Sequence, residues 1–340
     1  MQTLLTPGRL HGADGRLAEA GWARRELRRY DRAAVQASRW RIKEWDYYCI
    51  ANDTAALALT VADNAYLGFL GLSWIDLTGR TATNHGATRA MPLGRMALPA
   101  SADSGDIVQQ FGGVSLAFRH VPGGRVLTFD APKFGGGKGL KGELSLTQPD
   151  EDRMVIATPF AEDPLAFYYN QKINCLPAQG EAMLDGTVHR FDSGSSFAVL
   201  DWGRGVWTYD NTWYWGSASG LAGGRRFGFN IGYGFGDTSA ASENMLFVDG
   251  TAHKLDRVEF HLPPGRPDSA PWRFSSNDGR FEMTFEPLVD RADKVSLLGL
   301  FMTDQHQVFG RYSGVVTLDD GNILEITDLV GFAEKVHNRW

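Results

Sequence analysis

The sequence has few cysteines and no long apolar run. Its two cysteines among 340 residues, Cys49 and Cys175, indicate a reducing compartment or simple core packing, and the sequence leaves open whether they pair. The longest apolar-rich run, YLGFLGLSWI at 66–75, is far shorter than the roughly 20 residues that a membrane helix needs, so we expect no transmembrane segment. The opening MQTLLTPGRLHGADG lacks the basic and apolar regions of a signal peptide, and we therefore expect a cytoplasmic protein.

Basic residues are not in excess, and metal-ligand patterns are missing. The formal net charge of −6 argues against a nucleic-acid partner, because duplex binding depends on Lys and Arg side chains that neutralise phosphates. No HxxxH or CxxC cluster occurs among the eight His and two Cys, so we predict no metal site. The run GGGKGLKG at 135–142 lacks the spacing of a P-loop and the Ser or Thr that follows its Lys. We therefore expect a flexible loop there and a protein without a cofactor.

The chain is rich in glycine, aromatic residues and turn signals. Forty Gly and an aromatic content of 12% accompany β-branched runs, which favours β-structure. Asp-Gly turns recur, as in DGTVHRFD (185–192) and DGTAHKLD (249–256), and such dipeptides are strong signals of a β-hairpin. Consecutive hairpins must close their sheets to remove exposed edges. We therefore predict an all-β, mainly antiparallel protein with two successive barrels, or with one barrel and one curved sandwich.

The N-terminal region departs from this pattern. Residues 15–36 have the strongest helix propensity of the chain, so we predict a short N-terminal helical segment. The Arg-rich stretch 24–43 is interpreted as a solvated helix and strand lead-in, with an acidic or phosphate partner as the alternative. We place the change of domain near 180–200, which gives an N-terminal barrel-like domain at 1–185 and a C-terminal barrel-like domain at 186–340.

The most unusual segment is rich in tryptophan. Four Trp and two Tyr lie between Trp202 and Trp215, with charged residues among them. Trp207, Tyr209, Trp213 and Trp215 all have odd numbers, so one continuous strand would place them on one face. That face would be either barrel core or the wall of a cavity for an apolar or planar ligand. The residues that we predict to bind a ligand are Trp45, Tyr48, Trp202, Trp207, Tyr209, Trp213, Trp215 and Phe235.

These segments resemble a bacterial family described as domain of unknown function 2804. The matching pieces follow in order across nearly the whole chain: RIKEWDYY (41–48), LDWGRGVWTYDNTWYW (200–215), GFGD (234–237), EN (243–244), DGTAHKL (249–255), HQVFGRYSG (306–314) and NRW (338–340). A more distant resemblance, through an Asp-Gly turn followed by Asp-Trp-Gly and a Trp-rich strand, is to the lipocalin-like group of carotenoid hydratases, tocopherol cyclases and Diels–Alderase-type proteins. It implies two consecutive calycin-like barrels and an apolar substrate. Asp201, Trp202 and Gly203 match that group's junction motif in kind, whereas its His-Glu pair is absent, so a hydratase mechanism does not transfer directly.

Charged residues near this block are candidates for acid/base chemistry. Asp201 and Arg204 would pair if their segment were helical or tightly turned, and Asp201 could then donate a proton with Arg204 as its electrostatic partner. Asp237 and Glu243 fall on an expected loop, and His306 could transfer protons beside a carboxylate. Each of the five also has a structural interpretation, as an interdomain tie, a turn cap or a hydrogen-bonded imidazole.

The sequence leaves three functions open. The first is an enzyme that encloses an apolar small molecule, such as an isoprenoid, a lipid or a polyketide, and hydrates, isomerises or cyclises it without a cofactor. The second is a carrier or sensor with the same cavity. The third is a carbohydrate-active enzyme, in which Trp side chains stack on sugars and two carboxylates roughly 5–9 Å apart act on the glycosidic bond. The oligomeric state also stays open.

Overall fold

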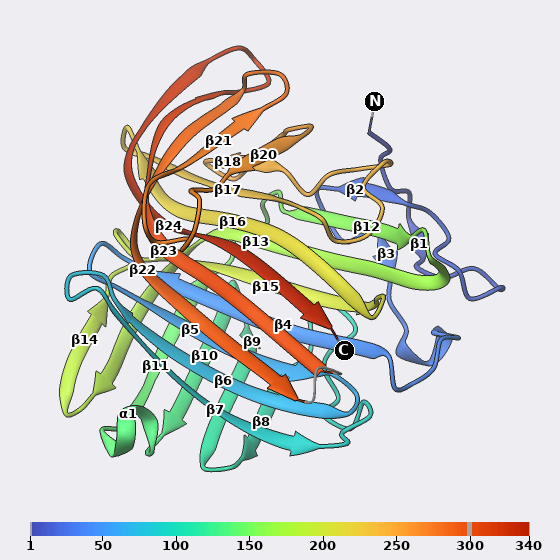
Figure 1. Cartoon of the computed structure of the whole chain (residues 1–340), viewed down its shortest axis with the longest axis horizontal. Helices are drawn as coiled ribbons and strands as arrows, with labels where there is room; N and C mark the ends of the chain where they lie inside the picture. Colours follow the sequence, from blue (N-terminus) through green and yellow to red (C-terminus); the bar gives the residue numbers. More distant parts are fainter. Residues whose placement is uncertain (1, 298–300, 340) are drawn as a thin grey trace.

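The computed structural model describes residues 2–297 and 301–339 and is built almost entirely from strands (Figure 1). Two antiparallel sheets have 13 and 9 strands, and β1 (Gly8–Arg9) forms a small parallel pair with β3 (Arg28–Arg29). The 13-stranded first sheet forms a nearly closed barrel, and the 9-stranded second sheet forms a half-barrel. The predicted all-β, mainly antiparallel fold is confirmed, with the second barrel only half closed.

Both sheets consist mainly of strands that follow one another along the chain and pair as hairpins. In each sheet, two such runs of hairpins join where strands that are far apart in the sequence pair. The first sheet runs in the order β7 (Thr81–Ala90), β6 (Leu67–Asp76), β5 (Ala55–Asp63), β4 (Ile42–Ala51), β15 (Phe197–Val206), β13 (Asp163–Leu184), β11 (Leu140–Thr147), β10 (Gly124–Ala131), β9 (Val114–Val121) and β8 (Ile107–Phe111). Beside this path, β12 (Met154–Phe160) and β14 (Thr187–Phe191) pair with β13, and β2 (Gly21–Ala23) pairs with β12. The second sheet runs in the order β19 (Thr251–Lys254), β18 (Met245–Val248), β17 (Arg225–Tyr233), β16 (Asp210–Ala222), β24 (Ile323–Arg339), β23 (Phe301–Thr317), β22 (Phe281–Leu297), β21 (Trp272–Ser276) and β20 (Val258–His261).

The chain changes sheets between Val206 and Asp210, where β15 ends and β16 begins. The predicted division into domains at 185/186 falls in the turn between β13 and β14, inside the first sheet. That division stays a prediction.

Helix is confined, within the described ranges, to η1 (Arg32–Ala34) and α1 (Phe134–Gly137). The helix predicted over 15–36 is therefore reduced to one 3-10 turn. Trp22 lies instead in β2, with 7% of its surface exposed, because burial against the barrel outweighs the local helix propensity. No helix in the described part of the chain has the length and apolar character needed to cross a membrane.

The Asp-Gly turns form hairpins as predicted. Asp185 and Gly186 connect β13 to β14, and Asp249 and Gly250 connect β18 to β19. Their φ angles are 53°, 76°, 46° and 85°. Two successive residues with positive φ are typical of a type I′ turn, which Asp-Gly tolerates and whose twist matches that of the flanking strands.

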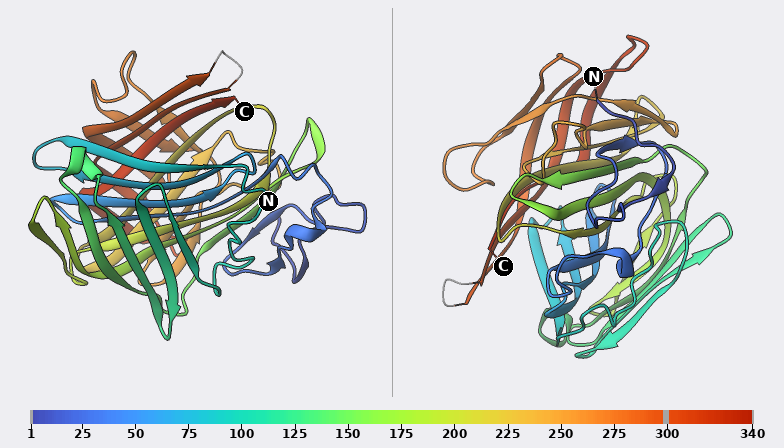
Figure 2. Two further views of the ribbon diagram at one scale, coloured as in Figure 1. Left: turned by 90° about the horizontal axis from the view of Figure 1, so that it is seen from below. Right: turned by 90° about the vertical axis from the view of Figure 1, so that its right-hand side faces the viewer.

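Strands β4 and β15 use their two faces differently. They are neighbours with Tyr47 opposite Asp201, and successive side chains on a strand point to opposite faces. The even-numbered Tyr48, Trp202 and Arg204 point into the barrel, whereas Tyr47 and Asp201 point toward the second sheet. Figures 1 and 2 show β22–β24 lying over this outer face. The predicted pairing of Asp201 with Arg204 does not form, because a strand places residues three apart on opposite faces.

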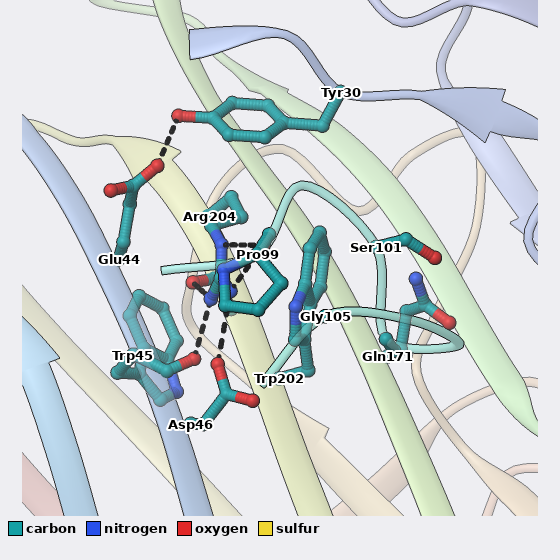
Figure 3. A network of polar contacts seen from close by, with 12 residues as sticks. Tyr30, Glu44, Trp45, Asp46, Pro99, Ser101, Gly105, Gln171, Trp202 and Arg204 are labelled. Carbon is teal, nitrogen blue, oxygen red and sulfur yellow. Dashed lines mark hydrogen bonds and ion pairs between the residues drawn. The ribbon is translucent and has the colours of Figure 1, made fainter. Parts of the chain in front are cut away.

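Arg204 connects several parts of the barrel interior (Figure 3). Its side chain is 0% exposed, and its Nη2 donates a hydrogen bond to Asp46 Oδ1 at 2.9 Å. The guanidinium lies 4.1 Å from the ring centroid of Trp202 and donates to the carbonyl oxygens of Trp45 and Pro99, each at 2.7 Å. The loop that carries Pro99 therefore enters the lumen, which is filled by a buried ion pair and packed side chains.

The first prediction concerns this buried ion pair. Arg204→Ala should lower the free energy of unfolding by about 3–5 kcal/mol, because it leaves the Asp46 carboxylate buried without its partner. Arg190→Ala removes an exposed ion pair with Glu181 and should cost less than about 1 kcal/mol. Urea unfolding followed by circular dichroism measures both variants. Equal unfolding midpoints for the two would contradict a central role for Arg204.

Candidate functional site

A cavity of about 250 Å³ lies between the outer face of the first sheet and the second sheet. We call it the intersheet pocket. Strands β4, β5, β6, β13 and β15 contribute side chains from the first sheet, and β16, β22, β23 and β24 contribute side chains from the second. Its size is near the lower end of the roughly 300–1,000 Å³ found for small-molecule sites.

One end of the intersheet pocket is an aromatic wall, formed by Trp45, Tyr168, Trp207, Trp213 and Phe235. The ring centroid of Phe235 lies 4.7 Å from that of Tyr168, 5.1 Å from Trp207 and 5.2 Å from Trp213. Trp45 lies 5.3 Å from Trp207 at 70°. Edge-to-face contacts of this kind hold the rings in fixed positions and offer a large apolar surface to a ligand.

Gly203 makes room for this wall. It lies opposite Trp45 in the β4–β15 register, and a Cβ atom at this position would stand 2.0 Å from the Trp45 indole. The three residues of the Asp-Trp-Gly motif therefore have different roles, because successive side chains on a strand point to opposite faces. Asp201 faces the pocket, Trp202 packs in the barrel, and Gly203 lets a neighbouring indole lie flat over the backbone.

The other end of the intersheet pocket is polar. Lys172 Nζ lies 2.9 Å from Asp201 Oδ1 and 3.7 Å from the ring centroid of Trp215. Asn170 Nδ2 donates to the same Asp201 oxygen at 2.6 Å. Among the described residues, no donor contacts Asp201 Oδ2, so this oxygen is available to a ligand or water.

Glu334 is the most unusual carboxyl group of the pocket. Trp213 Nε1 donates to its Oε1 at 3.0 Å, and Gln305 Nε2 donates to its Oε2 at 3.4 Å. Burial raises the pKa of Glu334 to about 7, although the Trp213 hydrogen bond and the charge of Lys172 act in the opposite direction. Near neutral pH this group can therefore either donate or accept a proton.

Glu243 is a second buried carboxyl group at the polar end. Asn230 Nδ2 donates to its Oε2 at 3.2 Å, while Asn230 Oδ1 accepts from Trp215 Nε1 at 2.7 Å. Its Oε1 packs against Gly232, where a Cβ atom would approach to 2.6 Å. Burial raises the pKa of Glu243, and the neighbouring Lys172 charge partly offsets this rise.

Seven of the predicted site residues meet in the intersheet pocket. Five are ligand-binding candidates and two are candidate acids: Trp45, Trp207, Trp213, Trp215, Phe235, Asp201 and Glu243. Trp45, Asp201, Trp213 and Trp215 converge because they share the odd-numbered faces of β4, β15 and β16. Trp207, Phe235 and Glu243 reach the pocket from the segments that connect strands. Whether they act on a ligand stays a prediction.

Three predicted residues lie in the barrel core instead. Tyr48, Trp202 and Arg204 are each no more than 1% exposed and do not line the pocket. The Tyr48 hydroxyl accepts a hydrogen bond from Arg125 Nη1 at 3.0 Å. All three have even numbers on β4 or β15, so the strand alternation directs them inward.

Three further predicted residues lie away from the pocket. Tyr209 is 52% exposed, because the expected continuous strand is interrupted between β15 and β16. Asp237 is exposed and caps a turn through the Ser239 amide. His306 lies on the opposite face of β23, where its Nδ1 is 2.6 Å from Asp290 Oδ2.

Sequence reasoning missed Lys172, Glu334, Tyr168 and Arg291, which also line the intersheet pocket. A signal exists for two of them. Lys172 lies in a polar step of β13 between the aromatic run 167–169 and Ile173, and Glu334 interrupts an alternation of apolar residues along β24. An ionisable residue at an inward position of a strand indicates either an ion pair or a site. Tyr168 is indistinguishable from core, and Arg291 follows a register shift that the sequence does not reveal.

Metal binding has no support in the described residues. Across 2–297 and 301–339, no group of three or more His, Cys, Asp or Glu side chains could hold a metal ion.

The fold and the pocket together define a lipocalin-like β-protein with a ligand-sized cavity between its two sheets. The chain belongs to the family described as domain of unknown function (DUF2804), which it matches over residues 1–340. No curated protein matches the chain.

Two solved structures are similar in architecture. CghA in complex with Sch210972 is 12% identical, with a TM-score of 0.50 over 88% of each chain. Kievitone hydratase from Nectria haematococca is 11% identical, with a TM-score of 0.49 over 88% of each chain. At this identity, the similarity to CghA establishes a common fold and nothing about the reaction.

The second prediction concerns the pKa of Glu334. An acid whose pKa rises on folding stays protonated while the unfolded chain ionises, so protein stability falls as pH rises from about 4.5 to about 7. Glu334→Gln removes this loss and keeps an acceptor for Trp213. Relative to the wild type, its free energy of unfolding should therefore rise by up to about 3 kcal/mol between pH 4.5 and pH 8.

Urea unfolding at pH 4.5, 6, 7 and 8 measures this difference. Glu259→Gln, at an exposed position of β20, is the matched control. Its free energy of unfolding should differ little from that of the wild type and should not rise relative to it between pH 4.5 and pH 8. A difference between Glu334→Gln and the wild type that is constant over the whole pH range would contradict the raised pKa.

Proposed function

We propose that the protein encloses a small molecule with a largely apolar body in the intersheet pocket and acts on it by acid/base chemistry without a cofactor. The reaction class is hydration, isomerisation or cyclisation. The observation that carries this proposal is Glu334, a buried carboxyl group whose pKa is raised to about 7 and which accepts a hydrogen bond from Trp213 of the aromatic wall. Such a combination of burial, cavity and perturbed acidity is characteristic of catalytic acids and bases.

The aromatic wall would hold the substrate. Its Trp and Tyr rings present apolar faces at fixed angles, which favours an apolar or planar body such as an isoprenoid or polyketide. A crystal structure of CghA, with which the chain shares its fold, contains Sch210972, which supports small-molecule binding by this architecture.

Glu334 and Asp201 would transfer the protons. In a hydration, protonated Glu334 gives its proton to one alkene carbon while the oxygen of a water molecule bonds to the other carbon. The proton that this water loses passes to Asp201 or returns to Glu334, so the sum is the addition of one water. Lys172 holds Asp201 in position and stabilises negative charge that develops nearby. Lys172 thus takes the electrostatic part that the sequence suggested for Arg204.

The third prediction tests the acid/base assignment. Native mass spectrometry of protein purified from its own host, followed by organic extraction, identifies the bound compound, which then serves in turnover assays. Glu334→Gln should lower kcat at least about 100-fold with little change in compound binding, because it removes the proton and keeps the shape. Asp201→Asn should act in the same direction.

Glu259→Gln is the control for this assay and should turn over the compound at the wild-type rate. Wild-type rates in both Glu334→Gln and Asp201→Asn would contradict the assignment. Tight binding without any product in the wild type would instead support a carrier, and hydrolysis of a bound glycoside would support a carbohydrate-active enzyme.

A further inference from the structure

Arg291 is a cation on the wall of the intersheet pocket that is held by neutral side chains. It lies on β22 and lines the cavity. Its Nη1 donates to Gln307 Oε1 at 2.7 Å, and its Nε donates to Ser73 Oγ at 2.8 Å and to Asn84 Oδ1 at 3.1 Å. All three partners are neutral. No carboxylate of the described chain forms an ion pair with Arg291, and no described acceptor contacts its Nη2.

Two neutral groups in the same cavity also lack partners. Asn338 is 4% exposed, and its buried Oδ1 makes no hydrogen bond within the described part of the chain. Tyr168 is 6% exposed, and its hydroxyl likewise has no hydrogen-bond partner among the described residues. Burial keeps the pKa of Tyr168 well above its ordinary value, so the hydroxyl remains a neutral donor. The Tyr168 hydroxyl can donate to an acidic oxygen of a ligand, whereas the Asn338 Oδ1 atom would accept from a hydroxyl or N–H group.

The ionisable side chains that line the intersheet pocket favour the binding of an anionic ligand. Lys172 and Asp201 form an ion pair and compensate each other. Burial raises the pKa of Glu334 to about 7, so near neutral pH this group carries less negative charge than an exposed carboxylate would. Burial also raises the pKa of Glu243. The guanidinium of Arg291 acts on Glu334 only through space and forms no ion pair in the described part of the chain, so it can take an anionic group as a direct partner.

We infer that the ligand of the intersheet pocket is an amphipathic anion, with an apolar body against the aromatic wall and a carboxylate or another acidic oxygen group bound by Arg291. The guanidinium is planar and fixed by its three neutral partners, which leaves Nη2 as a preoriented donor. This inference rests on the proposed function only in taking the intersheet pocket as the ligand site. It narrows the ligand class from apolar compounds to organic acids.

A pair of fluorescent probes tests the inference. 1-Anilinonaphthalene-8-sulfonate and N-phenyl-1-naphthylamine have the same aromatic frame, and only the first carries an acidic group. Titrations are made with the wild type, Arg291→Gln, Arg291→Lys and two controls. Arg311→Gln removes another arginine that contacts backbone of both sheets, through Asp53 and Asp328, but lies outside the pocket. Ala62→Phe places a large side chain in the cavity beside Trp45 and should block the pocket. Probe fluorescence that is lost in this variant is therefore assigned to binding in the intersheet pocket.

The expected result has a specific pattern. Arg291→Gln should raise the Kd of the sulfonate probe at least about tenfold and leave the Kd of the neutral probe within about twofold, while Arg291→Lys recovers part of the loss. Arg311→Gln should bind both probes like the wild type. The neutral probe also reports whether the pocket remains intact in the Arg291 variants.

Two other results would overturn the inference in distinguishable ways. If both probes bind the pocket and Arg291→Gln weakens them equally or not at all, the anionic class is wrong, while the pocket as a ligand site stands. If the fluorescence of both probes is the same in Ala62→Phe as in the wild type, or if neither probe binds, the intersheet pocket is not a site for such molecules. The proposed function then fails together with the inference.

Discussion

The fold depends on a buried guanidinium. Arg204 neutralises Asp46, covers Trp202 and binds carbonyl oxygens of a neighbouring strand and an entering loop, all inside the first barrel. A charge in this place is tolerated because an opposite charge and several acceptors surround it. The buried ion pair also determines where a ligand can bind. The lumen in which a small barrel can hold a ligand is occupied, and the ligand-sized space lies instead on the outer face, under the second sheet.

The strand pair β4 and β15 therefore contributes to both the barrel core and the intersheet pocket. On β4 and β15, the inner side chains build the barrel core, and the outer side chains build the intersheet pocket. Trp45 shows how closely the two are connected. Its carbonyl oxygen accepts from Arg204, while its indole lies over Gly203 and forms part of the aromatic wall. The ion pair inside the barrel thus fixes the backbone from which the pocket side chains project.

The chemistry of the pocket follows from burial more than from any motif. Asp201, Glu243 and Glu334 line the same pocket as Lys172, and burial acts on the two Glu side chains. Burial penalises the charged form of a carboxyl group, so the pKa of Glu243 is raised and that of Glu334 reaches about 7. A carboxyl group whose pKa lies near 7 can both donate and accept a proton near neutral pH, which is the property that the proposed acid/base chemistry uses.

The sequence by itself determined the antiparallel β class and the Asp-Gly hairpins, because these follow from local turn chemistry and side-chain alternation. It could not determine whether Asp201 and Arg204 lie in a strand or in a tight turn, and so it allowed them to pair, although β15 separates them onto opposite faces. Nor could it show that the strand breaks before Tyr209 or that β13 and β24 bring Lys172 and Glu334 to the same cavity. Only the tertiary structure decided these points, since strand register and the stacking of two sheets are set by contacts between residues far apart in the chain.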